Sequence, residues 1–112
     1  MFGFQRLDAY RSATLFLATV TKLVTQIPKG HSDLVDQLRR AALSVPLNIA
    51  EGSGKFGRDA ARFYTIARGS ALECAAILDA LEALEVVDER SLQKPRGLLE
   101  RVVSMLTGLI RP

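Results

Sequence analysis

Apolar residues recur every three or four positions along four stretches of the chain, and this spacing places side chains on one face of an α-helix. The first stretch begins near Asp8 and stops before Pro28, which cannot continue a helix. We therefore predict a first amphipathic helix over this stretch. Its repeating apolar residues are Leu7, Tyr10, Ala13, Leu17, Val20, Val24 and Ile27.

A second helical stretch follows a short turn, with Ser32 or Asp33 as its N-cap. Three glycines within residues 52–57 end it, because glycine favours a loop over continued helix. Pro46 falls inside the pattern, where it lacks a backbone donor and its ring crowds the carbonyl four residues earlier. We expect a kink there, or a break and restart between residues 42 and 46. The apolar positions are Leu34, Leu38, Ala41, Ala42, Val45 and Ile49.

The third stretch is the longest, from Ala60 to about Val87, and its many alanines allow close approach of a neighbouring helix. A turn is expected over residues 88–91, followed by a fourth helix from Leu92 to Ile110 with Pro95 near its start. The third apolar series is Phe63, Ile66, Ala67, Ala71, Cys74, Ile77, Leu78, Leu81 and Leu84, and the fourth is Leu92, Leu99, Val102, Val103, Leu106, Leu109 and Ile110.

No segment alternates apolar and polar residues with the period of a β-strand over a useful length. Four helices with short connections predict an all-α fold, an antiparallel up-down-up-down four-helix bundle whose second helix is kinked at Pro46. The 112 residues suit one domain, residues 1–112. No apolar run is long enough to span a bilayer, and the start of the sequence lacks the pattern of a signal peptide. A single cysteine, Cys74, cannot form a disulfide framework, which agrees with a reducing compartment. Together these features predict a cytoplasmic protein without membrane contact.

Charge is unevenly distributed, although the net charge is only +3. Residues 39–68 hold six cations and two anions, whereas residues 69–90 hold one cation and six anions. The first of these segments has a basic patch that suits anionic partners such as RNA. Its candidate nucleic-acid-binding residues are Arg39, Lys55, Arg58 and Arg62, beside the aromatic Phe56. The alternative interpretation is an ordinary solvated helix face.

The familiar signatures of catalysis and cofactor binding lack their structural context. Gly52-x-Gly54-x-x-Gly57 has the letters of the dinucleotide-binding fingerprint, but a predicted helix precedes it instead of a strand. His31 has no second ligand to complete a metal site, and Cys74 lies on an apolar helix face. We therefore predict no catalytic residues, no cofactor and no metal, and expect that the protein is not an enzyme.

Polar residues also recur at helical spacing within the apolar pattern, and we expect them to line one seam between the second and third helices. Either they form a hydrogen-bonded network that fixes helix register or a subunit contact, or Glu51 and Glu73 form a carboxylate active site. The first interpretation is favoured, since no histidine or nucleophile accompanies the carboxylates. The predicted network residues are Arg40, Ser44, Asn48, Glu51, Arg68 and Glu73.

Two motifs resemble a known family. Residues 37–52, QLRRAALSVPLNIAEG, and residues 62–73, RFYTIARGSALE, resemble proteins encoded in intervening sequences of bacterial large-subunit (23S) ribosomal RNA genes, a family often called "four helix bundle protein". The second segment is similar to the family signature Phe-x-x-x-Ala-Arg-Gly-Ser-x-x-Glu. The resemblance implies an antiparallel bundle, a second helix that runs on through Pro46, ring-like homopentamers and no established catalytic activity.

A related branch, the accessory variability proteins of diversity-generating retroelements, is similar in fold and contacts nucleic acid and a reverse transcriptase through a basic surface. We therefore expect a non-enzymatic oligomeric scaffold, with a homopentamer favoured, that binds RNA or a ribonucleoprotein partner through the basic patch. The alternative is an assembly that binds only proteins, docking through the acidic end of the third helix. A small enzyme using Glu51 and Glu73 is the third hypothesis.

Overall fold

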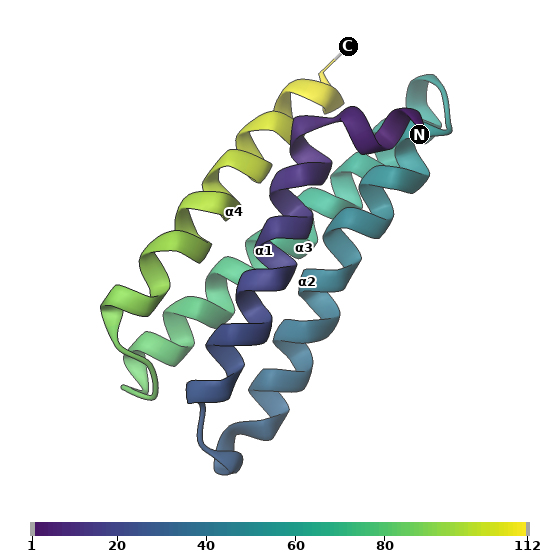
Figure 1. Ribbon diagram of the computed structural model, residues 1–112. Helices are drawn as coiled ribbons and strands as arrows, with labels where there is room; N and C mark the ends of the chain where they lie inside the picture. The colour runs from purple at the N-terminus through teal and green to yellow at the C-terminus, as the bar shows by residue number, and fades with distance from the viewer. Residues whose placement is uncertain (1, 112) are drawn as a thin grey trace.

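The computed structural model describes residues 2–111, and within them four α-helices account for most of the chain (Figure 1). A short 3-10 helix precedes the first α-helix, and two more connect the first and second α-helices. The described part of the chain has no strand, so the all-α prediction is confirmed. The helices are α1 (Asp8–Leu23), α2 (Ser32–Ser53), α3 (Gly57–Ala83) and α4 (Glu89–Ile110), with 3-10 helices η1 (Gly3–Arg6), η2 (Val24–Gln26) and η3 (Lys29–His31).

The four helices form a bundle in which α1 packs against α2 and α4, and α3 packs against the same two helices. The hydrogen bond between Ser44 and Ser70 joins the middle of α2 to the middle of α3, and the one from Arg96 to Asp79 joins the first half of α4 to the last turns of α3. Figure 1 shows the chain running down α1, up α2, down α3 and up α4. The long axis measures 43 Å, which a 27-residue helix nearly spans.

The start of the bundle differs in detail from the sequence prediction. The α-helical part of the first stretch ends at Leu23, and the chain tightens into η2 before Ile27 becomes extended. Phe16 is fully buried, whereas its neighbour Leu17, which the apolar series had placed in the core, is half-buried. Phe16 lies three positions after Ala13 and Leu17 lies four, and both steps are compatible with one apolar face, so spacing alone did not separate the two.

Helix α2 continues without interruption from Ser32 to Ser53, with Pro46 inside it. The expected break and restart between residues 42 and 46 was therefore wrong, and a bend at Pro46 stays a prediction. Both neighbouring helices hold α2 in place by burying Pro46 together with Val45 and Ile49. This packing compensates for the missing proline donor.

Helix α3 ends at Ala83, four residues earlier than expected, and the following turn spans residues 84–88. Glu85 adopts a positive φ of 57°, and the amide of Val86 donates to the carbonyl of Leu81, which is the Schellman way of ending a helix. Asp88 then caps α4 by accepting a hydrogen bond of 2.8 Å from the amide of Ser91. The turn predicted over residues 88–91 is thus already helix from Glu89 onwards.

A single apolar core runs through the bundle, with contributions from all four helices. Leu38, Leu78, Leu92 and Leu106 are among its fully buried side chains. Ile66 and Leu84, expected in the core, are exposed because each lies on the outer side or beyond the end of α3. No helix within residues 2–111 is long and apolar enough to cross a membrane.

Candidate functional site

Three cations of the predicted basic patch lie close together at the α2–α3 connection and the first turns of α3. Lys55 and Arg62 both place their charge over the ring of Phe63, at 5.8 and 5.4 Å from its centroid. Arg58 is exposed one turn before Arg62. Phe56, between them in the loop, is 92% exposed. We call Lys55, Arg58 and Arg62 the basic end of the bundle.

The fourth predicted nucleic-acid contact, Arg39, is not part of this group. It lies 16 positions before Lys55, mostly within α2, which corresponds to about 24 Å along the helix axis. The sequence analysis grouped Arg39 with the loop cations because all of them lie in the net-positive segment of residues 39–68. Arg39 is exposed in the N-terminal half of α2.

Backbone geometry favours an anion at the basic end. Gly57 starts α3 with a positive φ of 53°, a conformation that suits glycine, and Asp59 is the acidic residue of the first turn. The first amides of a 27-residue helix carry a partial positive charge. Arg58 and Arg111 line a hollow of about 520 Å³ beside this terminus, and sequence reasoning missed Arg111 because it lies far away in the chain.

Gly52 explains why the connection is so tight. A Cβ built at this buried position would lie 2.8 Å from Cε1 of Tyr64 and 3.2 Å from the carbonyl oxygen of Ala60. The absence of a side chain therefore lets the end of α2 rest against the first turns of α3. The glycine pattern of residues 52–57 serves helix packing and the loop, as the predicted interhelical turn requires.

A short polar seam joins α2 and α3 in the middle of the bundle. The hydroxyls of Ser44 and Ser70 are 2.8 Å apart, and Asn48 donates to both the carbonyl and the hydroxyl oxygen of Ser44, at 2.8 and 3.0 Å. Further down, Gln37 donates to Glu73 at 3.3 Å. The Ser44–Ser70 and Gln37–Glu73 contacts cross between the two helices and fix their register, because each needs one relative height, whereas Asn48 supports Ser44 within α2. Ser70 and Gln37 were missed, although both lie in the two motifs.

The other predicted network residues lie elsewhere. Arg40 and Glu51 are exposed on the outer side of α2, where Glu51 forms an ion pair of 3.7 Å with Lys55. Arg68 turns to the opposite neighbour and donates to Thr107 of α4 at 2.9 Å. The expectation of one common seam was therefore too broad, because residues three or four apart on α2 drift around its axis over several turns.

The two candidate catalytic glutamates are far apart. Glu73 contacts Gln37, and Glu51 lies 14 positions further along α2, a rise of about 21 Å. Burial and the charge of Glu73 raise the pKa of Cys74 to about 12, which keeps this thiol protonated and unreactive. Within residues 2–111, no three His, Cys, Asp or Glu side chains gather in a way that could hold a metal ion.

A match to a known protein family covers nearly the whole bundle. Residues 5–108 match the family described as 23S rRNA-intervening sequence protein. The chain belongs to this family. The matched range contains α1, α2 and α3 completely and all but the last two residues of α4, so the intervening-sequence family accounts for the architecture as a whole.

A solved structure agrees with this assignment. The bundle is similar to the crystal structure of a protein of unknown function from the S23 ribosomal protein family of Bacteroides thetaiotaomicron, with a TM-score of 0.83. The two chains are 18% identical, over 93% of this chain and 96% of the other, and at this identity the likeness shows the fold alone. The comparison with curated proteins gives no match.

The two motifs of the intervening-sequence family acquire separate tasks in this bundle. Ser44 and Ser70 join α2 to α3, Asn48 supports Ser44, and Gly52 lets the helices meet at the connection. Arg62 contributes to the basic end. The motifs thus combine residues that shape the bundle with residues that remain available at its surface.

Proposed function

We propose that this member of the family is a non-enzymatic scaffold that self-associates and binds RNA through the basic end. The observation that carries the proposal is the gathering of Lys55, Arg58 and Arg62 around one loop with the exposed ring of Phe56 among them. Cations bind phosphates and an exposed aromatic ring stacks on unpaired bases.

The expected affinity of one copy is low. Glu51 pairs with Lys55, and Asp59 lies in the first turn of α3, so the basic end is partly neutralised. Self-association offsets this weakness because an assembly presents one basic end per copy and gains from multivalency. Exposed leucines on several helices supply apolar surface for the assembly, and a homopentamer is the proposed form.

RNA binding is tested by titrating the protein into a short fluorescently labelled single-stranded RNA and measuring anisotropy at several salt concentrations. With about three phosphates neutralised per engaged copy, the logarithm of affinity falls against log salt with a slope of roughly −2 to −3. The double variant Lys55→Glu/Arg58→Glu should flatten the slope. Lys22→Glu/Lys29→Glu changes the net charge by the same amount at exposed positions near the α1–α2 connection, at the other end of the bundle, and is the control.

Two results would reject RNA binding at this site. One is no binding at low salt, and the other is an equal loss of RNA affinity in the Lys55/Arg58 variant and in the Lys22/Lys29 variant. In either case a scaffold that binds only proteins becomes the better explanation. Self-association is measured separately by light scattering after size exclusion, where a homopentamer gives about five times the chain mass of 12.2 kDa.

A further inference from the structure

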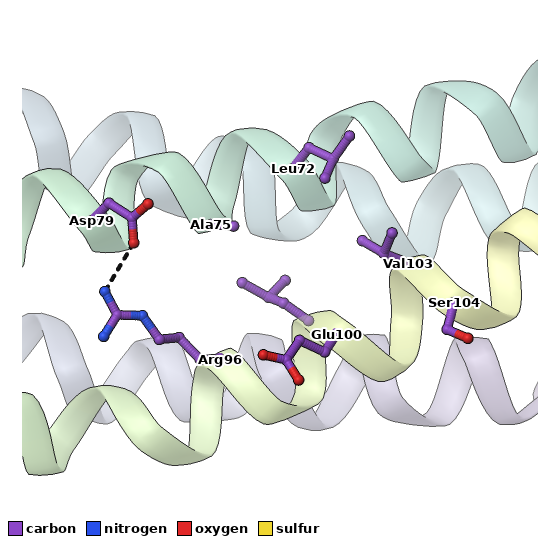
Figure 2. A pocket seen from close by; sticks show the side chains of 8 residues that line it. Leu72, Ala75, Asp79, Arg96, Glu100, Val103 and Ser104 are labelled. Atoms are coloured by element: carbon purple, nitrogen blue, oxygen red, sulfur yellow. Dashed lines mark hydrogen bonds and ion pairs between the residues drawn. The ribbon is translucent and has the colours of Figure 1, made fainter.

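An apolar groove lies between α3 and α4, on a side of the bundle away from α2 (Figure 2). It encloses about 420 Å³, and its walls are Leu72 and Ala75 on α3 and Leu99 and Val103 on α4. Leu72 is 45% exposed. We call this the α3–α4 groove, and its rim contains Asp79, Arg96, Glu100 and Ser104.

The rim of the α3–α4 groove has a net negative charge, because its carboxylates outnumber its one arginine. Arg96 is held at one end by Asp79 and Glu82, each at 2.9 Å, and Figure 2 shows the pair with Asp79. The positive charge of Arg96 is therefore already compensated. Glu100 is exposed on the rim and makes no ion pair among the described residues. An occupant that brings a cation to Glu100 would complement the groove.

A matching ridge lies on the outer side of α2. Leu43 and Leu47, one turn apart, are 47% and 58% exposed, and Arg39 and Arg40 lie one turn before Leu43. None of the ion pairs among the described residues involves these two arginines. We call these four residues the α2 ridge.

We infer that the α2 ridge of one copy docks in the α3–α4 groove of the next copy of the same chain. The inference rests on the self-association proposed above and names its contact. It assigns Arg39 and Arg40 to a protein interface, in place of the RNA contact that sequence reasoning gave to Arg39.

Heights along the bundle support this pairing. The Ser44–Ser70 hydrogen bond places Leu43 within about one helical turn of Leu72. The Arg68–Thr107 and Arg96–Asp79 contacts place Leu72 level with Val103. Copies related by rotation about an axis along the bundle keep these heights, so Leu43 meets the apolar walls.

Opposite charges also meet when the two copies lie at equal heights along the bundle. Arg39 and Arg40 lie one turn below Leu43, and Glu100 lies about one turn below Val103. Parallel copies therefore bring the arginines of the ridge to the unpaired carboxylate of the rim. Pairing of a cation with an otherwise unpaired anion gives the contact its orientation.

The ridge and the groove are different surfaces, so one copy uses both at once. Helix α2 packs against α1 and α3, whereas the groove opens between α3 and α4. Such a contact is heterologous, and its repetition closes into a ring or continues as a filament. Isologous pairing of two parallel ridges would bring the arginines of both copies together, which charge repulsion disfavours, whereas isologous pairing of two antiparallel ridges would leave the assembly intact in the groove variant Leu72→Glu described below.

The decisive experiment blocks each surface separately. Leu43→Glu blocks the ridge and Leu72→Glu blocks the groove, and each variant alone should have the mass of one chain, 12.2 kDa, by light scattering. An equimolar mixture retains one intact ridge and one intact groove, and should form a dimer of twice that mass. Leu15→Glu on α1, where Leu15 is 48% exposed, is the matched control and should keep the wild-type mass.

A charge exchange tests the orientation. Glu100→Arg in the ridge-blocked chain should weaken the mixed dimer about five- to tenfold, and Arg39→Glu/Arg40→Glu in the groove-blocked chain should restore it. Circular dichroism of each variant shows that the helices are retained.

The outcomes separate this contact from the scaffold itself. A wild-type protein that is monomeric at micromolar concentration would overturn both self-association and this interface. A wild-type assembly that persists in both blocked variants would overturn the interface alone. A mixture that forms no dimer, although each variant is a folded monomer, would overturn the heterologous pairing.

Discussion

Single side chains decide how closely α2 and α3 approach in this bundle. Gly52 meets Tyr64 and Ala60 without a Cβ, while the half-buried Ser44, Asn48 and Ser70 satisfy one another within the seam. Buried polar groups without partners would cost about 1–3 kcal/mol each, so these contacts favour one register over its neighbours.

Gly52→Ala should destabilise the fold by about 1–3 kcal/mol, because the new methyl group would collide with the ring of Tyr64 and the nearby carbonyl. Urea unfolding measures the change. Gly97→Ala is the matched control, since this exposed position in α4 has open space, and there alanine should stabilise the helix by about 0.5–1 kcal/mol. Equal stability of the two variants would contradict the close-approach explanation.

Cys74 gives the fold a defined response to alkaline pH. Burial and the neighbouring Glu73 raise its pKa in the folded state to about 12, from an ordinary value of 9.0. The thiol therefore contributes stability that is fully present below pH 9 and is lost as pH rises towards the folded value, by up to about 1.4 kcal/mol per pH unit.

The comparison of wild type with Cys74→Ala isolates this contribution. Urea unfolding at pH 8 and pH 10.5 should show the wild type losing more stability than the variant, because only the wild type carries the titrating thiol. The folded wild type should also react slowly with a thiol reagent at pH 8 and rapidly in urea. Equal pH dependence of the two proteins would show that Cys74 titrates normally.

At the level of helices, ends were harder to foresee than faces. Glu85 terminates α3 in the left-handed conformation that glycine usually supplies, with φ of 57°. The apolar contact between Val86 and the core accompanies this ending. A non-glycine residue there bears a steric cost of about 1–2 kcal/mol, which tertiary packing of the turn outweighs.

Glu85→Gly should raise the free energy of unfolding by about 0.5–1 kcal/mol, because glycine adopts this conformation without the steric cost. Thermal unfolding gives the measurement. Glu85→Ala serves as control, since it removes the same carboxylate but keeps a Cβ, and it should leave stability nearly unchanged. A glycine variant no more stable than the alanine variant would show that the turn is unstrained.

The periodicity of the sequence predicted the number of helices, their order along the chain and most of the core residues, because burial of one helix face requires a repeat of three or four residues. It failed where the signal was not local. Glu85 carries no sequence mark of a helix end, and at Pro46 local reasoning left a kink and a break open, of which the continuous α2 excludes the break. At the candidate site, Lys55, Arg58 and Arg62 were found because they are close in sequence, whereas Arg111 joins them only in the folded chain.

For the molecule as a whole, one core shared by four helices predicts one cooperative transition. Urea unfolding followed by far-ultraviolet circular dichroism and by tyrosine fluorescence should give coincident curves, since Tyr64 belongs to the same core as the helices. The proposed assembly would involve only the folded chain, so with self-association the midpoint of unfolding should rise with protein concentration. Separate transitions by the two probes would reveal more than one folding unit.

The brief connections between consecutive helices also set an order of events in time. Except for the contact between α1 and α4, each helix finds its partner next to it in the chain, and such local topologies fold in microseconds to milliseconds. Encounters between proteins occur at about 10⁵–10⁷ per molar per second, which at micromolar concentration takes about 0.1 to 10 seconds. On the proposed assembly, each newly folded copy exposes Leu43 and Leu47 until it meets another, and the length of this interval depends on the protein concentration.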